Sequence, residues 1–224
     1  MHSVARCGLF PTFAKSRYKP DKTMKTNLTK IVDYLLLKSL YIHDIGLFHG
    51  KMGIVLALFA YADRYKDHVL EEYAWDLFQQ VYDGMHADLP LGLENGLSGI
   101  GYGTTLMCAK GWAECDLNAV LADVDDKIMQ HDPRRLKDSS LRSGTGGLLL
   151  YLDFRQSISG PLLTFDRLYL SELQSVAPHK FKAESSANFV TCLTEPAFPM
   201  DEYLEKPIGI DGGSAYYILK NTLP

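Results

Sequence analysis

Several features common in other classes of protein are missing from this 224-residue chain. No apolar run approaches the roughly 18 residues that a membrane-spanning helix needs, so we expect no membrane span. The N-terminal segment has no continuous apolar stretch and no small-residue cleavage site, which argues against a signal peptide. Lys and Arg number 23 against 27 Asp and Glu, and this acidic balance argues against a dedicated nucleic-acid binder.

Cysteine is also scarce, and the four cysteines form neither a CxxC pair nor a regular framework. This usage predicts free thiols in a reducing cytoplasm. The 46% hydrophobic and 22% charged content is typical of a folded globular protein. We therefore expect one domain over residues 25–224, preceded by a flexible tail over residues 1–24. The cysteines are Cys7, Cys108, Cys115 and Cys192.

What the chain does contain is a glycine motif that repeats. GLFHGKMGI begins at Gly46 and GLENGLSGI begins 46 residues later, at Gly92, with glycines at the same three positions. SLRSGTGGL from Ser140 and GIDGGSAYY from Gly209 are partial copies. Four copies at this spacing predict a repeated supersecondary unit. The motif glycines are Gly46, Gly50, Gly53, Gly92, Gly96, Gly99, Gly144, Gly147, Gly209 and Gly213.

Helices are the expected secondary structure of each unit. Residues 54–66 are apolar nearly all round, which predicts a buried helix, whereas residues 69–85 place their apolar side chains on one stripe. The same order of a buried and an amphipathic helix returns over residues 100–112 and 117–129, and over 146–154 and 166–176. An amphipathic helix with Ile31, Leu35, Leu36 and Leu40 precedes the first motif.

This alternation predicts an all-α fold, an α/α toroid of helical hairpins that is partial here, with about four glycine-motif repeats. The glycines lie just before or in the first turn of each inner helix. Spacings of four and three predict one glycine face on which neighbouring inner helices approach closely. No predicted strand precedes them and no GK[ST] follows, which excludes a phosphate-binding loop. The expected core residues are Ile54, Leu56, Phe59, Ile100, Leu106, Leu148 and Leu150.

The motifs GLFHGKMGIVLALFAYA, LENGLSGIGYG, SGTGGLLLYL and GIDGGSAYYIL resemble the inner-helix motifs of the lanthionine synthetase C-like (LanC-like) family. The resemblance covers residues 29–152 and 209–219, and residues 158–208 match nothing in the family. It implies an α/α toroid that in the family has seven hairpins. It also implies peptide modification, because cyclase members join a cysteine thiol to dehydroalanine or dehydrobutyrine in a precursor peptide.

The chain departs from the cyclases at the zinc ligands that the resemblance implies. Phe48 occupies the cysteine position of the family's CHG motif, and only His49 and Gly50 are kept. No WCxG motif exists, because neither Trp75 nor Trp112 precedes a cysteine. Cys108 and Cys115 are expected at the opposite rim from the glycine loops. A zinc site needs three or four converging ligands, so we expect no metal and no cofactor in this chain.

The resemblance also places the third and fourth motif positions at the mouth of the ring. The candidate binding residues there are His49, Glu94, Asn95, Arg142, Ser143 and Asp211. Each has a structural alternative: Asn95, Ser143 and Asp211 as helix N-caps, Glu94 as a favourable charge near a helix N-terminus, and Arg142 and His49 as solvated side chains. Residues 123–127, DVDDK, lack the glycine and glutamate of a calcium loop and are expected on a wet helix face.

Three functions stay open at this point. The first is a zinc-free LanC-like protein that binds a precursor peptide or a modification-enzyme partner. The second is an α/α-toroid carbohydrate-active hydrolase or lyase that uses Glu94 and Asp211 as paired carboxylates. The third is an inactive fragment of a larger cyclase-like protein, which would expose an apolar inner-helix face.

Overall fold

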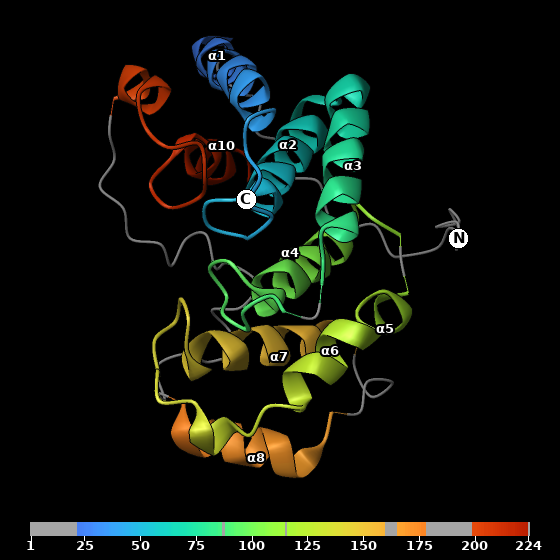
Figure 1. Ribbon diagram of the computed structural model, residues 1–224. Helices are drawn as coiled ribbons and strands as arrows, with labels where there is room; N and C mark the ends of the chain where they lie inside the picture. Colours follow the sequence, from blue (N-terminus) through green and yellow to red (C-terminus); the bar gives the residue numbers. More distant parts are fainter. Residues whose placement is uncertain (1–21, 87, 115, 160–164, 178–198, 224) are drawn as a thin grey trace.

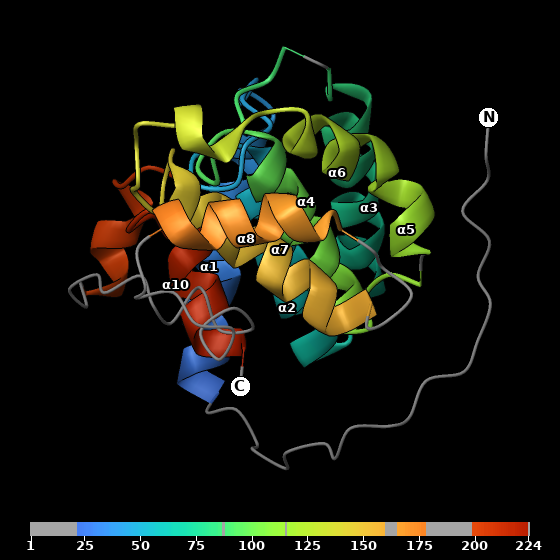
Figure 2. The ribbon, with the colours of Figure 1, turned by 90° about the horizontal axis from the view of Figure 1, so that it is seen from below.

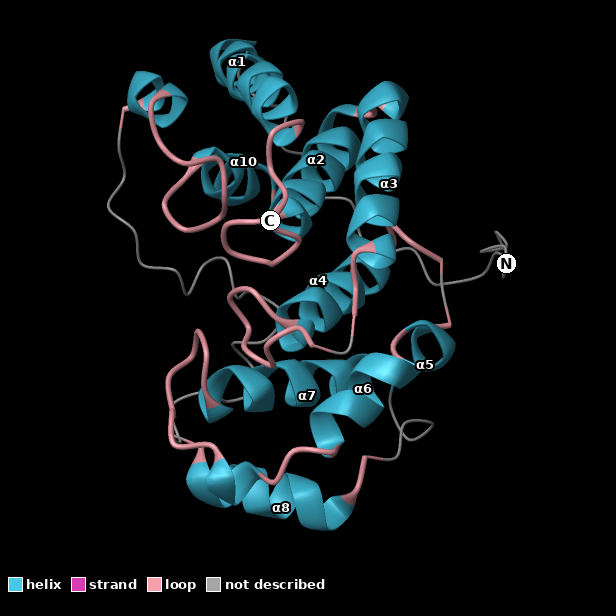
Figure 3. Ribbon diagram, in the orientation of Figure 1, coloured by secondary structure: helices cyan, strands magenta, loops and turns pink. Residues whose placement is uncertain are grey.

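The computed structural model describes residues 22–86, 88–114, 116–159, 165–177 and 199–223. Every regular element in these residues is a helix (Figures 1 and 3), which confirms the predicted all-α class. The α-helices are α1 (Lys22–Ser39), α2 (Lys51–Tyr65), α3 (His68–Asp83), α4 (Leu97–Ala109), α5 (Leu117–Val120), α6 (Ala122–Met129), α7 (Thr145–Ser159), α8 (Arg167–Val176) and α10 (Ser214–Thr222). Short 3-10 helices are η1 (Pro133–Arg135) and η4 (Met200–Leu204).

Four of these helices are buried and pack as a row. Helix α10 contacts α2, α2 contacts α4, and α4 contacts α7. Amphipathic helices cover the row: α1 packs on α10 and α2, α3 on α2, α6 on α4, and α8 on α7, in front of which it lies in Figure 2. The side chains expected in the core are all buried: Ile54, Leu56, Phe59, Ile100, Leu106, Leu148 and Leu150.

Several covering helices begin differently from the buried ones. The covering helices α3 and α8, and the short helix α5, have the aspartates Asp67, Asp166 and Asp116 as N-caps, whose carboxylates accept a backbone N–H of the first turn. In contrast, the buried helices α2, α4 and α10 have the glycines Gly50, Gly96 and Gly213 as N-caps, without a side-chain hydrogen bond. Glycine costs little at this position and leaves room for the backbone of the preceding loop.

The motif glycines therefore act in the loops and first turns, and the prediction that they line helix–helix contacts is wrong. A Cβ on Gly46 would lie 2.6 Å from Asn95 Cα, and one on Gly92 would lie 2.9 Å from Ser143 Cα. A Cβ on Gly209 would lie 2.0 Å from the Phe48 carbonyl oxygen. The first glycine of these three loops thus permits contact with the backbone of a neighbouring loop.

Later glycines of the motif meet their own loop. A Cβ on Gly96 would lie 2.0 Å from the Pro90 carbonyl oxygen, and one on Gly99 would lie 2.1 Å from that of Leu93. Positive φ angles occur at Gly111 and Gly212, which are not motif glycines. Close approach, and not backbone conformation, is therefore what the motif positions require of glycine.

Backbone hydrogen bonds join the loops in the same order as the row of helices. Ile210 N–H donates to the Phe48 carbonyl at 2.8 Å, and Phe48 N–H donates to the Glu94 carbonyl at 2.9 Å. Glu94 N–H donates to the Arg142 carbonyl at 2.8 Å. We call this series the loop ladder. It runs from the loop before α10, through those before α2 and α4, to the loop before α7.

Three local expectations need correction. Leu40 lies beyond the end of α1 and is 69% exposed, so it is not part of the helix stripe. The helix expected over residues 117–129 is divided at Leu121 into α5 and α6. Residues 22–24 of the expected tail belong to α1, and residues 1–21 lie outside the described part of the chain.

The cysteine prediction also changes. Cys108, near the end of α4, is disulfide-bonded, which corrects the prediction that all four thiols are free. Its partner lies outside the described residues, as do Cys7, Cys115 and Cys192. Among the described residues no helix is long and apolar enough to cross a membrane. The cytoplasmic location stays a prediction.

Candidate functional site

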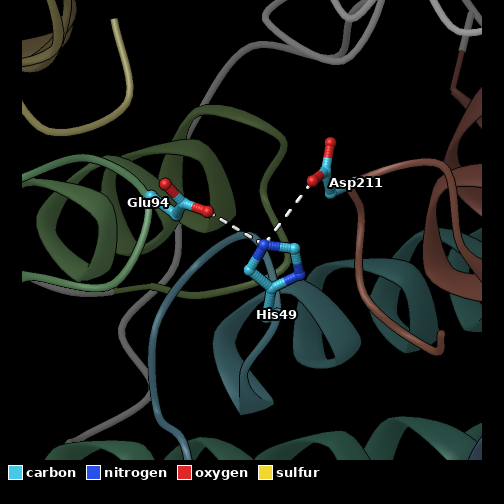
Figure 4. Close-up of side chains that lie close together, drawn as sticks. All are labelled: His49, Glu94 and Asp211. Atoms are coloured by element: carbon cyan, nitrogen blue, oxygen red, sulfur yellow. Dashed lines mark hydrogen bonds and ion pairs between the residues drawn. The ribbon is translucent and has the colours of Figure 1, made fainter. Parts of the chain in front are cut away.

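The loops that precede the four buried helices bring four polar side chains together. Arg142 lies between the two acids: its guanidinium donates to both oxygens of Asp211, at 2.9 and 2.6 Å, and to Glu94 Oε1 at 3.2 Å. His49 Nε2 lies 2.9 Å from Glu94 Oε1 and 3.5 Å from Asp211 Oδ2 (Figure 4). We call His49, Glu94, Arg142 and Asp211 the mouth cluster.

The loop ladder explains why these residues meet. Its hydrogen bonds join backbone groups at or next to the third position of each motif, which is Phe48, Glu94, Arg142 or Asp211. The first and last loops of the row then meet through Arg142 and Asp211, so the loop end of the row is curved. This is the convergence expected at the mouth of a ring. The partial toroid stays a prediction.

Phe48 has a different place from the other third-position residues. Its side chain is fully buried, and its ring lies under the guanidinium of Arg142, with 5.1 Å from the centroid to Cζ. A cation at this distance from an aromatic face is attracted by the ring quadrupole. The residue in the cysteine position of the resembled motif therefore forms an apolar floor under the mouth cluster.

The electrostatics of the cluster are dominated by Arg142. Its hydrogen bonds lower the pKa of the Asp211 carboxyl below the ordinary value, despite the opposing effect of partial burial. Asp211 in turn raises the pKa of Arg142. The side chains of Glu94 and Asp211 are 25% and 20% exposed, and those of His49 and Arg142 are 45% and 44% exposed, so a ligand in solvent can reach all of them.

Asn95 and Ser143 do not take part as predicted. Asn95 is exposed, and Ser143 donates its hydroxyl to Asp138 Oδ2 at 2.6 Å. No contact joins either side chain to the mouth cluster within the described part of the chain. The N-cap alternative for Asn95 and Asp211 is also wrong, since Gly96 and Gly213 occupy the N-cap positions of α4 and α10.

The mouth cluster does not fit the zinc site of the resembled cyclases. One atom each from His49, Glu94 and Asp211 lies within 4.8 Å of the others, a spacing at which a cation could be held. However, the guanidinium of Arg142 already pairs with both carboxylates, and a metal ion would have to compete with it for their oxygens. The set also contains no thiolate, the ligand that gives zinc sites much of their selectivity over harder metals.

A cavity beside the mouth cluster was not predicted from the sequence. Its volume is about 280 Å³, and His49 belongs to both the cavity and the cluster. The end of α1 and the segment before α10 supply its other walls. No motif marks it as a whole, because its lining residues other than His49 and Gly209 lie outside the glycine repeat. The lining residues are Tyr34, Lys38, Tyr41, Ile42, His49, Lys206, Pro207, Ile208 and Gly209.

A second polar cluster is buried between α6 and α7, away from the mouth. Asp125 was expected on a wet face but is only 5% exposed, which corrects that prediction. Tyr151 donates its hydroxyl to Asp125, and Arg155 Nε lies 3.4 Å from Asp125 Oδ2. Burial raises the pKa of Asp125 to about 6. The buried ends of these side chains join the two helices.

The chain was compared with known protein families and with curated proteins. It matches no family model and no curated protein. The loop geometry and the side chains of the mouth cluster are therefore what supports a function.

Proposed function

We propose that this chain is a LanC-like protein that binds a peptide at the mouth cluster, in peptide modification of the lanthipeptide type, without zinc cyclase activity. The observation that carries the proposal is the convergence of His49, Glu94, Arg142 and Asp211 from four separate loops at one end of the buried helices. Glu94, Arg142 and Asp211 occupy the third position of the motif that resembles the LanC-like family, and His49 occupies the fourth.

The chemistry of the mouth cluster suits a peptide. Glu94 and Asp211 accept hydrogen bonds from backbone or terminal N–H groups, and Arg142 donates to carbonyl or carboxylate oxygens. All three are held by one another before a ligand arrives, which lowers the entropy lost on binding. Loop backbones joined by the loop ladder provide the rigid support.

The two other functions have less support. A hydrolase with Glu94 and Asp211 as the pair needs one carboxylic acid that stays protonated, and the lowered pKa of Asp211 opposes that role for this residue. An inactive fragment should expose an apolar inner-helix face. Among the described residues of α2, α4, α7 and α10, the large apolar side chain that is exposed is Ile158, near the end of α7.

The proposal is tested by panning a random peptide library, displayed on phage, against the immobilised protein. We expect the native protein to enrich a family of peptides, and Arg142→Ala to bind those peptides at least about tenfold more weakly, because hydrogen bonds to a charged group contribute about 1.5–3 kcal/mol. Arg134→Ala is the matched control, since Arg134 is 65% exposed and pairs with Asp132 and Glu172 instead of with the mouth.

Circular dichroism of each variant shows whether it is folded. Enrichment that is equal for the native protein and folded Arg142→Ala would place binding elsewhere and overturn the proposal. No enrichment above bare resin would overturn it as well.

A further inference from the structure

The cavity between α1 and the segment before α10 has a charge that differs from that of the mouth cluster. Lys38 and Lys206 both line it, and no acidic side chain does so among the described lining residues. The whole chain has a net charge of -4, so a cavity whose formal charges are both positive departs from the character of the molecule. Lysine presents a compact ammonium charge, which pairs with carboxylate or phosphate oxygens.

Tyr34 holds the two walls of this cavity together. Its hydroxyl donates to the carbonyl oxygen of Lys206 at 3.4 Å, and the ammonium of Lys38 lies 5.8 Å from the centroid of its ring. These contacts link α1 to the segment that leads into α10. The cavity thus has a wall built from two parts of the chain that are far apart in sequence.

The size of the cavity limits what it can take. At about 280 Å³ it lies near the lower end of the range of ligand pockets, about 300–1,000 Å³, so it fits one side chain or headgroup and not a folded partner. It is open to solvent, as shown by Tyr41, which lines it and is 73% exposed.

The cavity adjoins the mouth cluster through one shared residue, His49. His49 lines the cavity, and its Nε2 contacts Glu94 and Asp211. Gly209, another lining residue, begins the loop that carries Asp211. A peptide at the mouth can therefore place a neighbouring side chain in the cavity.

We propose that this cavity is a subsite for one anionic side chain, a carboxylate or a phosphate ester, of the peptide that binds at the mouth cluster. The inference rests on the proposed function and names the class of peptide that the site selects. The two lysines supply the positive charge, and the tyrosine rings pack against the methylene groups of the bound side chain.

The peptides enriched by panning test this directly. We expect them to share an acidic residue at one position, and a synthetic peptide with that glutamate changed to glutamine to bind about tenfold more weakly, because the charge-assisted hydrogen bond is lost. We expect the difference in affinity between the glutamate and glutamine peptides to become smaller in Lys38→Ala and in Lys206→Ala. Lys110→Ala is the control, because Lys110 follows α4 at the end opposite the loops.

A third synthetic peptide with phosphoserine at the same position distinguishes the two anions: stronger binding than the glutamate peptide identifies a phosphate ester, and weaker binding identifies a carboxylate. Enriched peptides without an acidic preference would overturn the subsite and leave the proposed function standing. The subsite would also be overturned if the glutamate and glutamine peptides differed in affinity for Lys38→Ala and Lys206→Ala as much as they do for the native protein.

A probe that needs no peptide distinguishes failure of the anionic subsite from failure of peptide binding at the mouth cluster. N-acetylglutamate is titrated into protein with isotope-labelled lysines, and the signals of Lys38 and Lys206 are assigned with the two alanine variants. We expect both signals to shift. If panning gives no peptide but these signals shift, then peptide binding fails while the anion site stands, and if neither occurs, both proposals fail.

Discussion

Asp125 shows how burial and pairing act in opposite directions on one carboxyl group. Loss of hydration raises its pKa to about 6, while the Tyr151 hydroxyl and the Arg155 guanidinium oppose that rise. Arg155 is itself fully buried on α7 and donates to Asn118 at 2.9 Å. Removal of the acid would leave the guanidinium without a counter-charge, which typically costs about 3–5 kcal/mol.

The raised pKa of Asp125 predicts how stability changes with pH. The folded state binds the Asp125 proton more tightly than the unfolded chain, so this group favours folding most at low pH. Its contribution should fall as the pH rises from the ordinary pKa of 3.8 to about 6, by about 3 kcal/mol in total. Urea unfolding of the native protein and Asp125→Asn across this range measures the difference between their free energies of unfolding.

We expect that difference to become smaller as the pH rises through this window, since the asparagine variant lacks the titration. Tyr151→Phe provides a second comparison: it removes the hydrogen bond that lowers the pKa of Asp125, so the pH-dependent loss should extend to higher pH. Parallel stability curves for the three proteins would show that Asp125 does not titrate between the two values.

At the scale of the elements, the first glycine of three motifs, Gly46, Gly92 or Gly209, sets the distance between two loops. Gly209 is the clearest case, because the carbonyl that a Cβ would strike also accepts the Ile210 N–H of the loop ladder. Gly209→Ala should destabilise the protein by about 1–3 kcal/mol, the usual cost of overpacking. It should also separate Asp211 from His49, since the two lie on the loops that are pushed apart.

Amide hydrogen exchange at Ile210 provides the specific measurement. Its protection should be lost in Gly209→Ala and kept in Gly111→Ala, because nothing lies within 4 Å of a Cβ on Gly111. That control variant is strained only by its φ of 71°. Retained protection in Gly209→Ala would mean that the loops do not need the glycine.

The same elements show what could be predicted from the sequence. The repeat showed which loop positions are equivalent, and the family resemblance implied that His49, Glu94, Arg142 and Asp211 lie at one mouth. Spacings of four and three cannot tell an N-cap from a helix face, so the role of Gly50 and Gly96 was assigned wrongly. The burial of Asp125 depends on Arg155, a partner from another helix that helical periodicity does not reveal.

For the whole molecule, the composition of the mouth predicts that purified protein carries far less than one zinc per chain. Arg142 competes with any cation for Glu94 and Asp211, and no thiolate of the described residues lies beside them. The protein should also fail to cyclise a dehydrated, cysteine-containing peptide. Elemental analysis of the native protein, His49→Ala and the control His131→Ala tests the first statement.

Near-stoichiometric zinc that is lost in His49→Ala and kept in His131→Ala would return this protein to the cyclases. A thioether product detected by mass spectrometry would do the same, even if zinc were low. Both outcomes bear on the chemistry of the mouth and not on the loop ladder, which is built from backbone groups.

The loop ladder has a consequence for how such a protein can evolve. Backbone hydrogen bonds and glycines fix where the third position of each motif lies, whatever side chain it carries. A mutation from glutamate to arginine at one of these positions would change the chemistry of the mouth while leaving the framework intact. Glu94, Arg142 and Asp211 are then three equivalent positions on one backbone framework, above the buried Phe48, and new specificities can arise at them by single substitutions.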